Sequence, residues 1–390
     1  MPDHHVPSID ASLTELLLAE GPLTRLDLQR KLGVSRPTLS AAVNRLLDRG
    51  ALAESGIAVY GPGRNGRPQA LLAPNRSAGT AVGIELGRTQ LAVTVLAVDG
   101  TVLAQVSART GIHVPLQWKL EEALKHVKLF AASGQVSPGK VVGVGVGVTG
   151  RHPAAAAGGE LSPGDPDDVD LSAVRRLIPA PITWDNNTRM SAVRYLAGTS
   201  LTASDLGILF VVLSSGVSAG VLEQGRVFRG AGAAGELGHV CVEFGGELCS
   251  CSSRGCLEAY VGVDAVVKSA RRRGLAVSSV EELADHIQAR DSAALHLARD
   301  VGSYLGIGLS AAAMMLDPRG IVVTGPLAAW GDAFISSAEA ELSARRKAIG
   351  LASPRIVVAA SSEGDSSHGA ALRVLQEWGT SYLVEGHFSS

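Results

Sequence analysis

Three cysteines and a histidine lie close together in the stretch GELGHVCVEFGGELCSCSSRGCLEAY. His239 precedes Cys249 by ten residues, and Cys251 and Cys256 follow shortly after. Three thiolates and one imidazole form the ligand set of a closed, tetrahedral Zn²⁺ site. The spacing therefore predicts a structural zinc knuckle over residues 239–256, whereas reduced thiols in a glycine-rich loop are the alternative.

The same stretch contains a fourth cysteine and two glutamates. Cys241 follows His239 by two residues, and we expect it on the opposite face of a strand, buried and not bound to the metal. Glu236 and Glu258 bracket the cysteines, where carboxylates can accept strong hydrogen bonds from a polar ligand. The metal would hold these acids in place rather than carry out chemistry, because four protein ligands leave no open coordination position.

Length and composition describe a chain with room for two or three domains. The sequence has 390 residues, is 46% hydrophobic and has few aromatic residues, as is usual for an α/β protein. It contains no apolar run of the ~20 residues needed to cross a membrane, and its first residues resemble no secretory signal. We therefore expect a cytoplasmic protein, in which clustered cysteines favour metal binding over disulfides.

Positive charge is concentrated near the N-terminus, although the whole chain has a net charge of −2. Residues 24–67 contain eight lysines and arginines against three acidic residues. A basic segment on an acidic body suggests that nucleic acid binds at this end of the chain.

The N-terminal part has the pattern of a helix-turn-helix. A first helix is expected over residues 12–20. Thr24 is predicted to cap a second helix that ends at Gly33. Ser35 is predicted to cap a third helix that ends at Gly50. The residues predicted to face inward from the second and third helices are Leu26, Leu28, Leu32, Leu39, Val43, Leu46 and Leu47. The candidate DNA contacts, which face outward from the third helix, are Arg36, Thr38, Ser40, Asn44 and Arg45.

A wing is expected after the third helix. Residues 51–55 and 57–61 are its predicted strands, and a glycine-rich loop follows that contains Arg64 and Arg67. Arginine in a slender extended arm fits the narrow, negative minor groove of A·T-rich DNA. The prediction is a winged helix-turn-helix that binds double-stranded operator DNA, with a three-helix protein-interaction module as the alternative.

The rest of the chain alternates strands with helices, which predicts an α/β body. It resembles the two-lobed, actin-like fold of the sugar kinase, Hsp70 and actin superfamily. A strand delivers Asp185 to a sheet edge, where α/β proteins usually bind ligands. The expected divisions are 1–76 for the winged helix-turn-helix domain, 77–195 with helix 368–379 for the first lobe, and 196–367 for the second lobe.

Two loops that handle phosphate in that superfamily are altered in this chain. The first reads ELGRT from Glu85, with Glu in place of the usual Asp and Arg88 in place of a second glycine. The second reads SSGVSAG over residues 214–220, where serine or alanine occupies positions that are usually glycine. Because glycine lets the backbone approach phosphate closely, tight nucleotide binding is not expected.

Two motifs, GAAGELGHV and CSCSSRGCLEAY, are similar to the signature of the ROK family, named for repressors, open reading frames and kinases. The N-terminal helix-turn-helix and the stretch SYLGIGLSAAAMMLDPRGIVVTGPLA resemble ROK repressors of the xylose-repressor type. The metal ligands that the resemblance implies are His239, Cys249, Cys251 and Cys256. The sugar contacts that it implies are Asp185, which matches the kinase general base, Glu236, His239 and Glu258.

The chain departs from the family beside Asp185, where Trp184 replaces the usual Asn. Trp184 is expected either to stack on a sugar as a further contact or to close the site. Ser252, after the cysteine pair, replaces a common glycine, and we expect no consequence.

These observations predict a sugar-responsive transcriptional regulator, most simply a repressor of carbohydrate-metabolism genes, whose kinase-derived body has lost its activity. A sugar or sugar-phosphate would bind between the lobes and change the DNA affinity of a homodimer or tetramer, which is nucleoid-associated when bound. The alternatives are an active ATP-dependent sugar kinase with a DNA-binding head, and a regulator whose sugar site is closed. The identity of the sugar, the operator and the direction of regulation stay open.

Overall fold

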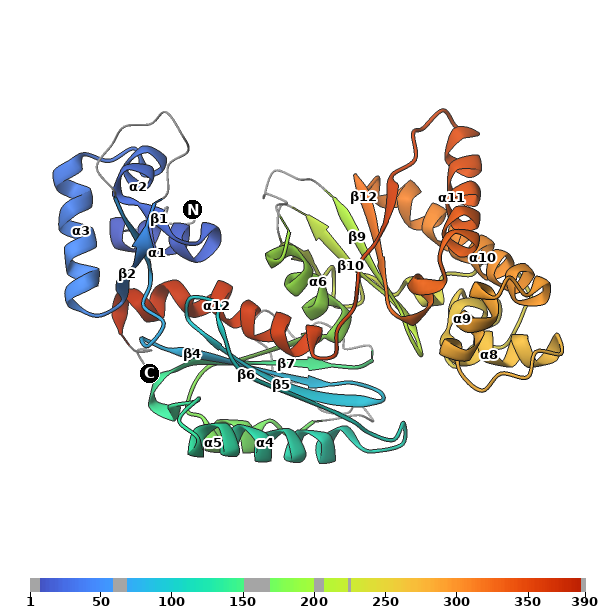
Figure 1. Cartoon of the computed structure of the whole chain (residues 1–390), viewed down its shortest axis with the longest axis horizontal. Helices are drawn as coiled ribbons and strands as arrows, with labels where there is room; N and C mark the ends of the chain where they lie inside the picture. The colour runs from blue at the N-terminus through green and yellow to red at the C-terminus, as the bar shows by residue number, and fades with distance from the viewer. Residues whose placement is uncertain (1–7, 59–68, 151–168, 200–206, 224–225, 387–390) are drawn as a thin grey trace. The chain divides into compact units, whose positions relative to one another are not determined.

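The computed structural model describes residues 8–58, 69–150, 169–199, 207–223 and 226–386 (Figure 1). The chain forms two compact units. The first comprises Met1–Thr149, Gly158–Arg194 and Gly364–Ser390, and the second comprises Gly150–Ala157 and Tyr195–Glu363. Within the described ranges, no helix is both long and apolar enough to cross a membrane.

The N-terminal head combines helices with a three-stranded antiparallel sheet in the order β1-β3-β2. Its elements are α1 (Ile9–Glu20), β1 (Leu23–Thr24), α2 (Arg25–Leu32), α3 (Arg36–Asp48), β2 (Leu52–Ile57) and β3 (Ala70–Pro74). The predicted caps are present, because the hydroxyls of Thr24 and Ser35 accept hydrogen bonds from the backbone N–H groups of Asp27 and Thr38. Gly33 ends α2 with a φ of 65°, a left-handed conformation that glycine adopts without steric cost.

The apolar stripe of the head differs from the prediction at one residue. Leu28, Leu39 and Leu46 are buried as predicted, whereas Leu26 is 46% exposed. Helix α2 has eight residues, and Leu28 is its buried residue. Leu26 lies two positions before Leu28 on this helix. Residues two apart on a helix point in different directions, so the two leucines do not share the buried face.

The wing also differs from the prediction. β2 continues through Ile57 and pairs antiparallel with β3, so the second strand lies at residues 70–74 rather than 57–61. Arg64 and Arg67 lie outside the described residues, and their minor-groove contacts stay predictions.

The first unit contains a five-stranded sheet in the order β6-β5-β4-β7-β8 (Figure 1). Its strands are β4 (Thr80–Leu86), β5 (Gln90–Ala97), β6 (Val102–Arg109), β7 (Val141–Val148) and β8 (Ile182–Asn186). β4, β5 and β6 pair antiparallel, whereas β7 and β8 extend the sheet in parallel from β4. One face packs against α4 (Leu116–Ala132) and α5 (Ser172–Leu177), and the other against α12 (Asp365–Glu385).

Helix α12, which includes the predicted helix 368–379, approaches the sheet closely. A Cβ added to Gly83 would overlap the backbone of Ser367, and one added to Gly145 would overlap that of Ala370. The hydroxyls of Ser367 and Thr94 are hydrogen-bonded at 2.7 Å. A side chain larger than hydrogen at either glycine would therefore push the helix away from the strands.

The head and the first unit's sheet share a hydrophobic core, and α12 lies between them. Its buried members include Leu13 and Leu17 of α1, and Val374 and Leu375 of α12. Arg49, after α3, also donates a 2.7 Å hydrogen bond to the carbonyl oxygen of a residue near the end of α12. The head is therefore packed onto this unit rather than attached to it only by a linker.

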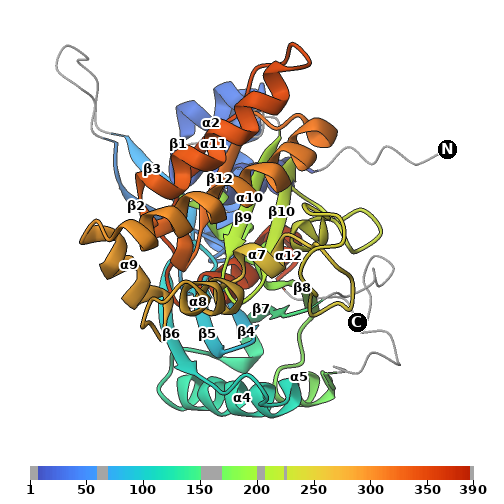
Figure 2. The ribbon, with the colours of Figure 1, turned by 90° about the vertical axis from the view of Figure 1, so that its right-hand side faces the viewer.

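The second unit contains another five-stranded sheet, in the order β11-β10-β9-β12-β13. Its strands are β9 (Ile208–Leu213), β10 (Val217–Glu223), β11 (Arg226–Phe228), β12 (Gly320–Thr324) and β13 (Arg355–Val358). Its helices include α7 (Glu258–Val261), α8 (Val263–Arg272), α9 (Val280–Gln288), α10 (Ser292–Leu316) and α11 (Asp332–Lys347). α10 and α11 lie side by side and contribute buried leucines and a phenylalanine to the core of this unit (Figure 2).

Candidate functional site

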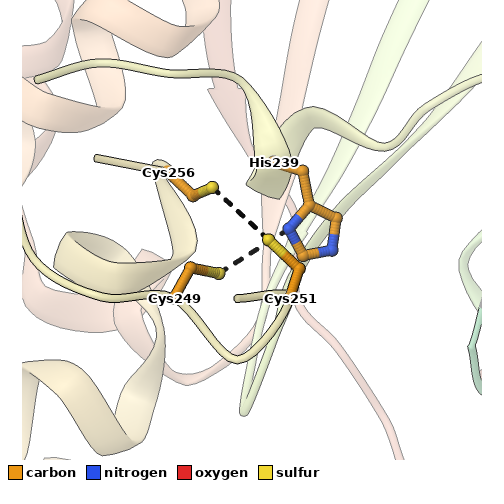
Figure 3. A group of neighbouring side chains, drawn as sticks. All are labelled: His239, Cys249, Cys251 and Cys256. Carbon is orange, nitrogen blue, oxygen red and sulfur yellow. Dashed lines mark hydrogen bonds between the residues drawn. The ribbon is translucent and has the colours of Figure 1, made fainter. Parts of the chain in front are cut away.

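The four predicted metal ligands converge in the second unit (Figure 3). The ligand atoms of His239, Cys249, Cys251 and Cys256 all lie within 4.8 Å of one another. Cys249 Sγ lies 3.7 Å from His239 Nδ1, and Cys251 Sγ lies 3.7 Å from Cys256 Sγ. Metal–sulfur bonds of about 2.3 Å in a tetrahedron place two sulfurs about 3.8 Å apart. The structure therefore contains a possible Cys₃His metal site.

The surroundings of the thiols suit a cation. Cys249 is 5% exposed and Cys256 is 2% exposed. A hydrogen bond from the backbone N–H of Ser253 lowers the pKa of the Cys251 thiol to about 6, whereas burial raises the pKa of Cys256 to about 12. A cation at the centre would offset the cost of burial, because metal ligation requires thiolates.

His239 presents its two ring nitrogens to different neighbours. It lies in the 3₁₀ helix η2 (Leu237–His239) rather than in the predicted strand. Its Nδ1 faces the sulfurs (Figure 3), and its Nε2 lies 3.8 Å from Glu236 Oε2. A histidine that binds a metal through one nitrogen has a fixed tautomer and can donate from the other. With Nδ1 facing the sulfurs, Nε2 of His239 faces Glu236.

Cys241 was predicted to be buried, and this is wrong, because its side chain is exposed. The segment that contains it forms an isolated bridge to Cys256 and belongs to neither five-stranded sheet. The expected strand, with one face covered by a core, is absent at this position, so nothing buries the thiol.

Ser252 has a φ of 69°, in the left-handed region that non-glycine residues seldom adopt. A Cβ in this conformation costs about 1–2 kcal/mol. The replacement of glycine by serine was expected to have no consequence, and this is wrong: the tight turn after Cys251 holds a strained residue.

Glu258 joins the cysteine loop to the turn between β9 and β10. Its Oε1 accepts a 2.9 Å hydrogen bond from the hydroxyl of Ser250, and its Oε2 accepts a 3.3 Å hydrogen bond from the backbone N–H of Val217. That turn is the second of the altered phosphate loops. A carboxylate beside its backbone N–H opposes phosphate binding by like-charge repulsion.

Asp185, in the first unit, forms a buried ion pair. Its Oδ1 lies 2.5 Å from Arg189 Nε, and both side chains are 6% exposed. The same oxygen accepts a hydrogen bond from the backbone N–H of Asn186 at 2.8 Å. A general base needs a lone pair directed at the proton that it removes, so the arginine competes directly with that role.

Trp184 lies beside Asp185 on β8, and the two side chains leave opposite faces of the sheet. Trp184 is paired in register with Val146 and packs against the core between the sheet and α4. Asp185 is paired with Gly147, on the face that α12 covers. This register argues against the predicted sugar contact of Trp184, and equally against its closing the site.

A buried lysine holds the first altered loop. Lys119, on α4, is 1% exposed, and its Nζ donates to the carbonyl oxygens of Gly87 and Arg88 at 2.6 and 2.8 Å. Burial lowers the pKa of this lysine. In the same loop, Glu85 accepts a 2.5 Å hydrogen bond from the side chain of Gln90. The loop is thus organised by the chain's own side chains.

The predicted DNA-contacting face of α3 divides into two parts. Arg36 and Thr38, at the start of the helix, are exposed, and Ser40 is partly exposed. Arg45 instead forms a 2.6 Å ion pair with Asp10 of α1. Asn44 is exposed, but its Oδ1 accepts a 3.3 Å hydrogen bond from Arg25. The start of α3 is therefore the part best placed to reach DNA, while Arg45 helps to hold α1.

Two residues of this region were missed from the sequence. Arg189 lies in the helix α6 (Asn187–Ala197), whereas Asp185 lies in β8, so no helical spacing rule could have indicated the pair. Lys119 is 32 residues from Gly87 and 31 from Arg88, whose carbonyl oxygens it binds, and no local pattern connects them.

The fold and the site define a class of protein: a winged helix-turn-helix joined to an actin-like α/β body that carries a Cys₃His cluster. Comparison with known families gives the same result. The ROK family model matches residues 81–377, and the model for winged helix-turn-helix DNA-binding matches residues 13–52. The chain belongs to the ROK family, which confirms the resemblance drawn from its motifs.

Similar proteins include both regulators and kinases. The xylose repressor of Bacillus spizizenii is 26% identical over 85% of this chain and 86% of that protein. The transcriptional dual regulator NagC of Escherichia coli is 24% identical over 81% of this chain and 80% of that protein.

Among solved structures, a ROK family transcriptional regulator that is a homologue of the E. coli MLC protein has a TM-score of 0.74 at 20% identity, over 97% of this chain and 99% of that one. A ROK hexokinase from Thermus thermophilus has a TM-score of 0.60 at 25% identity, over 75% of this chain and 97% of that one. These similarities confirm the predicted fold.

Proposed function

We propose that this protein is a zinc-containing, sugar-responsive transcriptional repressor of carbohydrate-metabolism genes without sugar kinase activity. The observation that carries the proposal is the shared core of the head and the ROK body through α12. A DNA-binding head packed in this way can respond to the state of the body that holds it.

The DNA-binding role rests on the head. In a helix-turn-helix, the start of the second helix of the motif contacts base edges in the major groove. Arg36 and Thr38 occupy that position on α3 and are exposed. Helix-turn-helix proteins read paired half-sites, so we assign the active form as a homodimer or tetramer. Residues 1–76 would form its DNA-binding domain.

The sugar-binding role rests on polar groups around the metal cluster. His239, Cys249, Cys251 and Cys256 would hold a zinc ion, whose contribution when bound is to fix the loop rather than to catalyse. Glu236 and Glu258 would accept hydrogen bonds from sugar hydroxyls, and His239 Nε2 would donate one. Asp185, in the first unit, stays a predicted sugar contact on the family resemblance alone.

The absence of kinase activity rests on three contacts. Arg189 pairs with the candidate base Asp185. Glu258 accepts from the N–H of Val217 in the second phosphate loop, and Lys119 binds carbonyl oxygens of the first. Phosphoryl transfer depends on a free base and on backbone N–H groups that cradle phosphate. The contacts of Arg189 and Glu258 each oppose one of these requirements, whereas Lys119 fixes the first loop through its carbonyl oxygens.

DNA binding in the presence of sugars tests the proposal. The zinc-loaded protein would be titrated against DNA from upstream of its own gene, with D-xylose, N-acetylglucosamine, glucose and their phosphates as effectors. One of these should change the affinity for DNA. Glu236→Gln should lose the response to that sugar and keep DNA binding, whereas the exposed Glu339→Gln on α11 should keep both.

The kinase alternative requires a separate assay. ATP consumption with the same sugars should stay at the level of the Asp185→Asn variant. Turnover that exceeds this variant and depends on sugar would overturn the claim that activity is lost.

A further inference from the structure

Cys241 lies next to the Cys₃His cluster in the sequence, but its thiol is not one of the four predicted metal ligands. The other three cysteines point toward one another and toward His239 (Figure 3). Cys241, in contrast, is exposed. The metal site explains the other cysteines but gives this one no role.

Cys241 lies directly opposite Cys256 on an adjacent antiparallel segment. The backbone N–H of Val242 donates to the carbonyl oxygen of Gly255 at 2.8 Å, and that of Leu257 donates to Val240 at 2.9 Å. These two bonds flank the cysteines, which are therefore a non-hydrogen-bonded pair. In such a pair the Cα atoms are about 4.5 Å apart and the side chains share one face. Disulfides span Cα separations of about 4.4–6.8 Å.

The sulfur of Cys241 lies over the segment that contains its partner. Its Sγ is 3.9 Å from the carbonyl oxygen of Arg254, and a Cβ built on Gly255 would lie 3.2 Å from it. The glycine thus leaves the space that this sulfur occupies. A disulfide would require the sulfur of Cys256 to turn toward Cys241 and away from Cys251, which it now faces at 3.7 Å.

The exposure of Cys241 and Cys256 determines which of the two thiols a dissolved oxidant reaches first. Cys241 is exposed, and Cys256 is 2% exposed. Susceptibility to oxidation follows access and thiolate character, and a sulfenic acid next to a second thiol condenses with it to a disulfide. The arrangement is that of an accessible thiol with a buried resolving cysteine.

We propose that Cys241 is a hydroperoxide-sensitive residue that, once oxidised, forms a disulfide with Cys256 and so removes one ligand from the metal site. The Cys241 thiolate attacks hydrogen peroxide, the O–O bond breaks, and a sulfenic acid and hydroxide form. The Cys256 thiolate then attacks that sulfur, the S–S bond forms, and the S–O bond breaks to release hydroxide. In total, two thiols and one peroxide give one disulfide and two waters.

Oxidation would also reach the effector site. Cys256 is followed two residues later by Glu258, which is hydrogen-bonded to Ser250 between two other ligands. With Cys256 in a disulfide, His239, Cys249 and Cys251 would remain, and three ligands bind zinc less tightly than a closed set of four. This consequence rests on the proposed function, whereas the disulfide itself does not.

The test uses the full-length, reduced protein as purified. Treatment with one equivalent of hydrogen peroxide should release zinc to a colorimetric chelator and give a Cys241–Cys256 cross-link in non-reducing peptide mass spectrometry. Reduction with added zinc should reverse both changes. Cys241→Ser keeps all four ligands, and it should need at least about tenfold more peroxide for the same release, since the accessible thiol is gone.

Two results would overturn the proposal. One is equal sensitivity of Cys241→Ser and the wild type, and the other is a disulfide confined to Cys249, Cys251 and Cys256. If the purified protein holds no zinc, the zinc assignment fails by itself. The peptide map then still decides the pairing: a Cys241–Cys256 cross-link supports it, and the lack of one overturns it.

Discussion

The two units contain five-stranded sheets with the same pairing pattern, but different structures are built on them. In each sheet, three strands pair antiparallel and two more extend it in parallel. In the first unit, one face of the sheet packs against α12, and α12 also packs against the DNA-binding head. In the second, Glu258 is hydrogen-bonded both to the turn between β9 and β10 and to the cysteine loop.

The corresponding turns show how one scaffold serves two purposes. The β4–β5 turn offers carbonyl oxygens to Lys119, and the β9–β10 turn offers an N–H group to Glu258. Both turns are the loops that the sequence resemblance predicts to be altered phosphate loops, and both bind side chains of the chain itself. The difference between the units thus lies in what they support: the first packs against the DNA-binding head through a shared hydrophobic core, and the second carries the Cys₃His cluster.

The largest effect is expected from breaking the ligand cluster. Cys251→Ser removes one of four ligands, so it should abolish stoichiometric zinc binding and lower the melting temperature of the second unit by on the order of 10 °C. Metal analysis and calorimetry would measure this, with the exposed Cys241→Ser as the matched control. A variant that keeps its zinc and its melting temperature would show that packing alone holds this unit.

The next effect is expected from the core of the first unit. Leu17 is 1% exposed and belongs to the core shared by the head and α12. Leu17→Ala should lower the free energy of unfolding by about 2–5 kcal/mol and weaken DNA binding, because a cavity forms where the head is packed. Denaturant unfolding would measure this. Leu26→Ala, at an exposed site on α2, should change the free energy by less than about 0.5 kcal/mol.

A smaller, pH-dependent effect is expected on α12. Burial, and then the charge of Arg194, lowers the pKa of His368 to about 4, while Asp365 acts in the opposite direction. The unfolded chain therefore binds the proton more readily, so the stability of the first unit should fall as the pH drops from 6.5 toward 4. Because the ring is partly exposed, solvent screening limits the loss to about 1 kcal/mol. Urea midpoints measured against pH should show this slope, and His368→Gln should remove it.

The smallest effect is expected at the turn after Cys251. Ser252→Gly should relieve the left-handed strain and raise the stability of the second unit by up to about 1 kcal/mol, less the added flexibility of the unfolded chain. Ser252→Ala retains the Cβ and should give no gain. Equal melting temperatures for the glycine and alanine variants would contradict this reading of the turn.

The parts of the fold that could be predicted depend on local rules. Thr24 and Ser35 cap helices because their hydroxyls reach backbone N–H groups three residues on. The four residues of the possible metal site were found because Cys₃His is a recognisable chemical set. These features are set by residues a few positions apart, or by residue type alone.

The parts that could not be predicted depend on contacts between distant residues. The strand that pairs with β2 lies at residues 70–74, and the local composition of β2 does not indicate which later segment pairs with it. Lys119 reaches a loop more than thirty positions earlier in the chain. The face of Trp184 depends on the register of β8 against β7. The exposure of Cys241 follows from the lack of a covering layer, which its neighbours in sequence do not reveal.

The most direct test of the account is the affinity of the zinc-loaded protein for DNA from upstream of its own gene, measured by fluorescence anisotropy with and without the sugar panel. We expect sequence-selective binding that one sugar changes about 5- to 150-fold, the range of typical coupling energies between sites. Equal affinity for that DNA and for a scrambled sequence, at every sugar concentration, would contradict it.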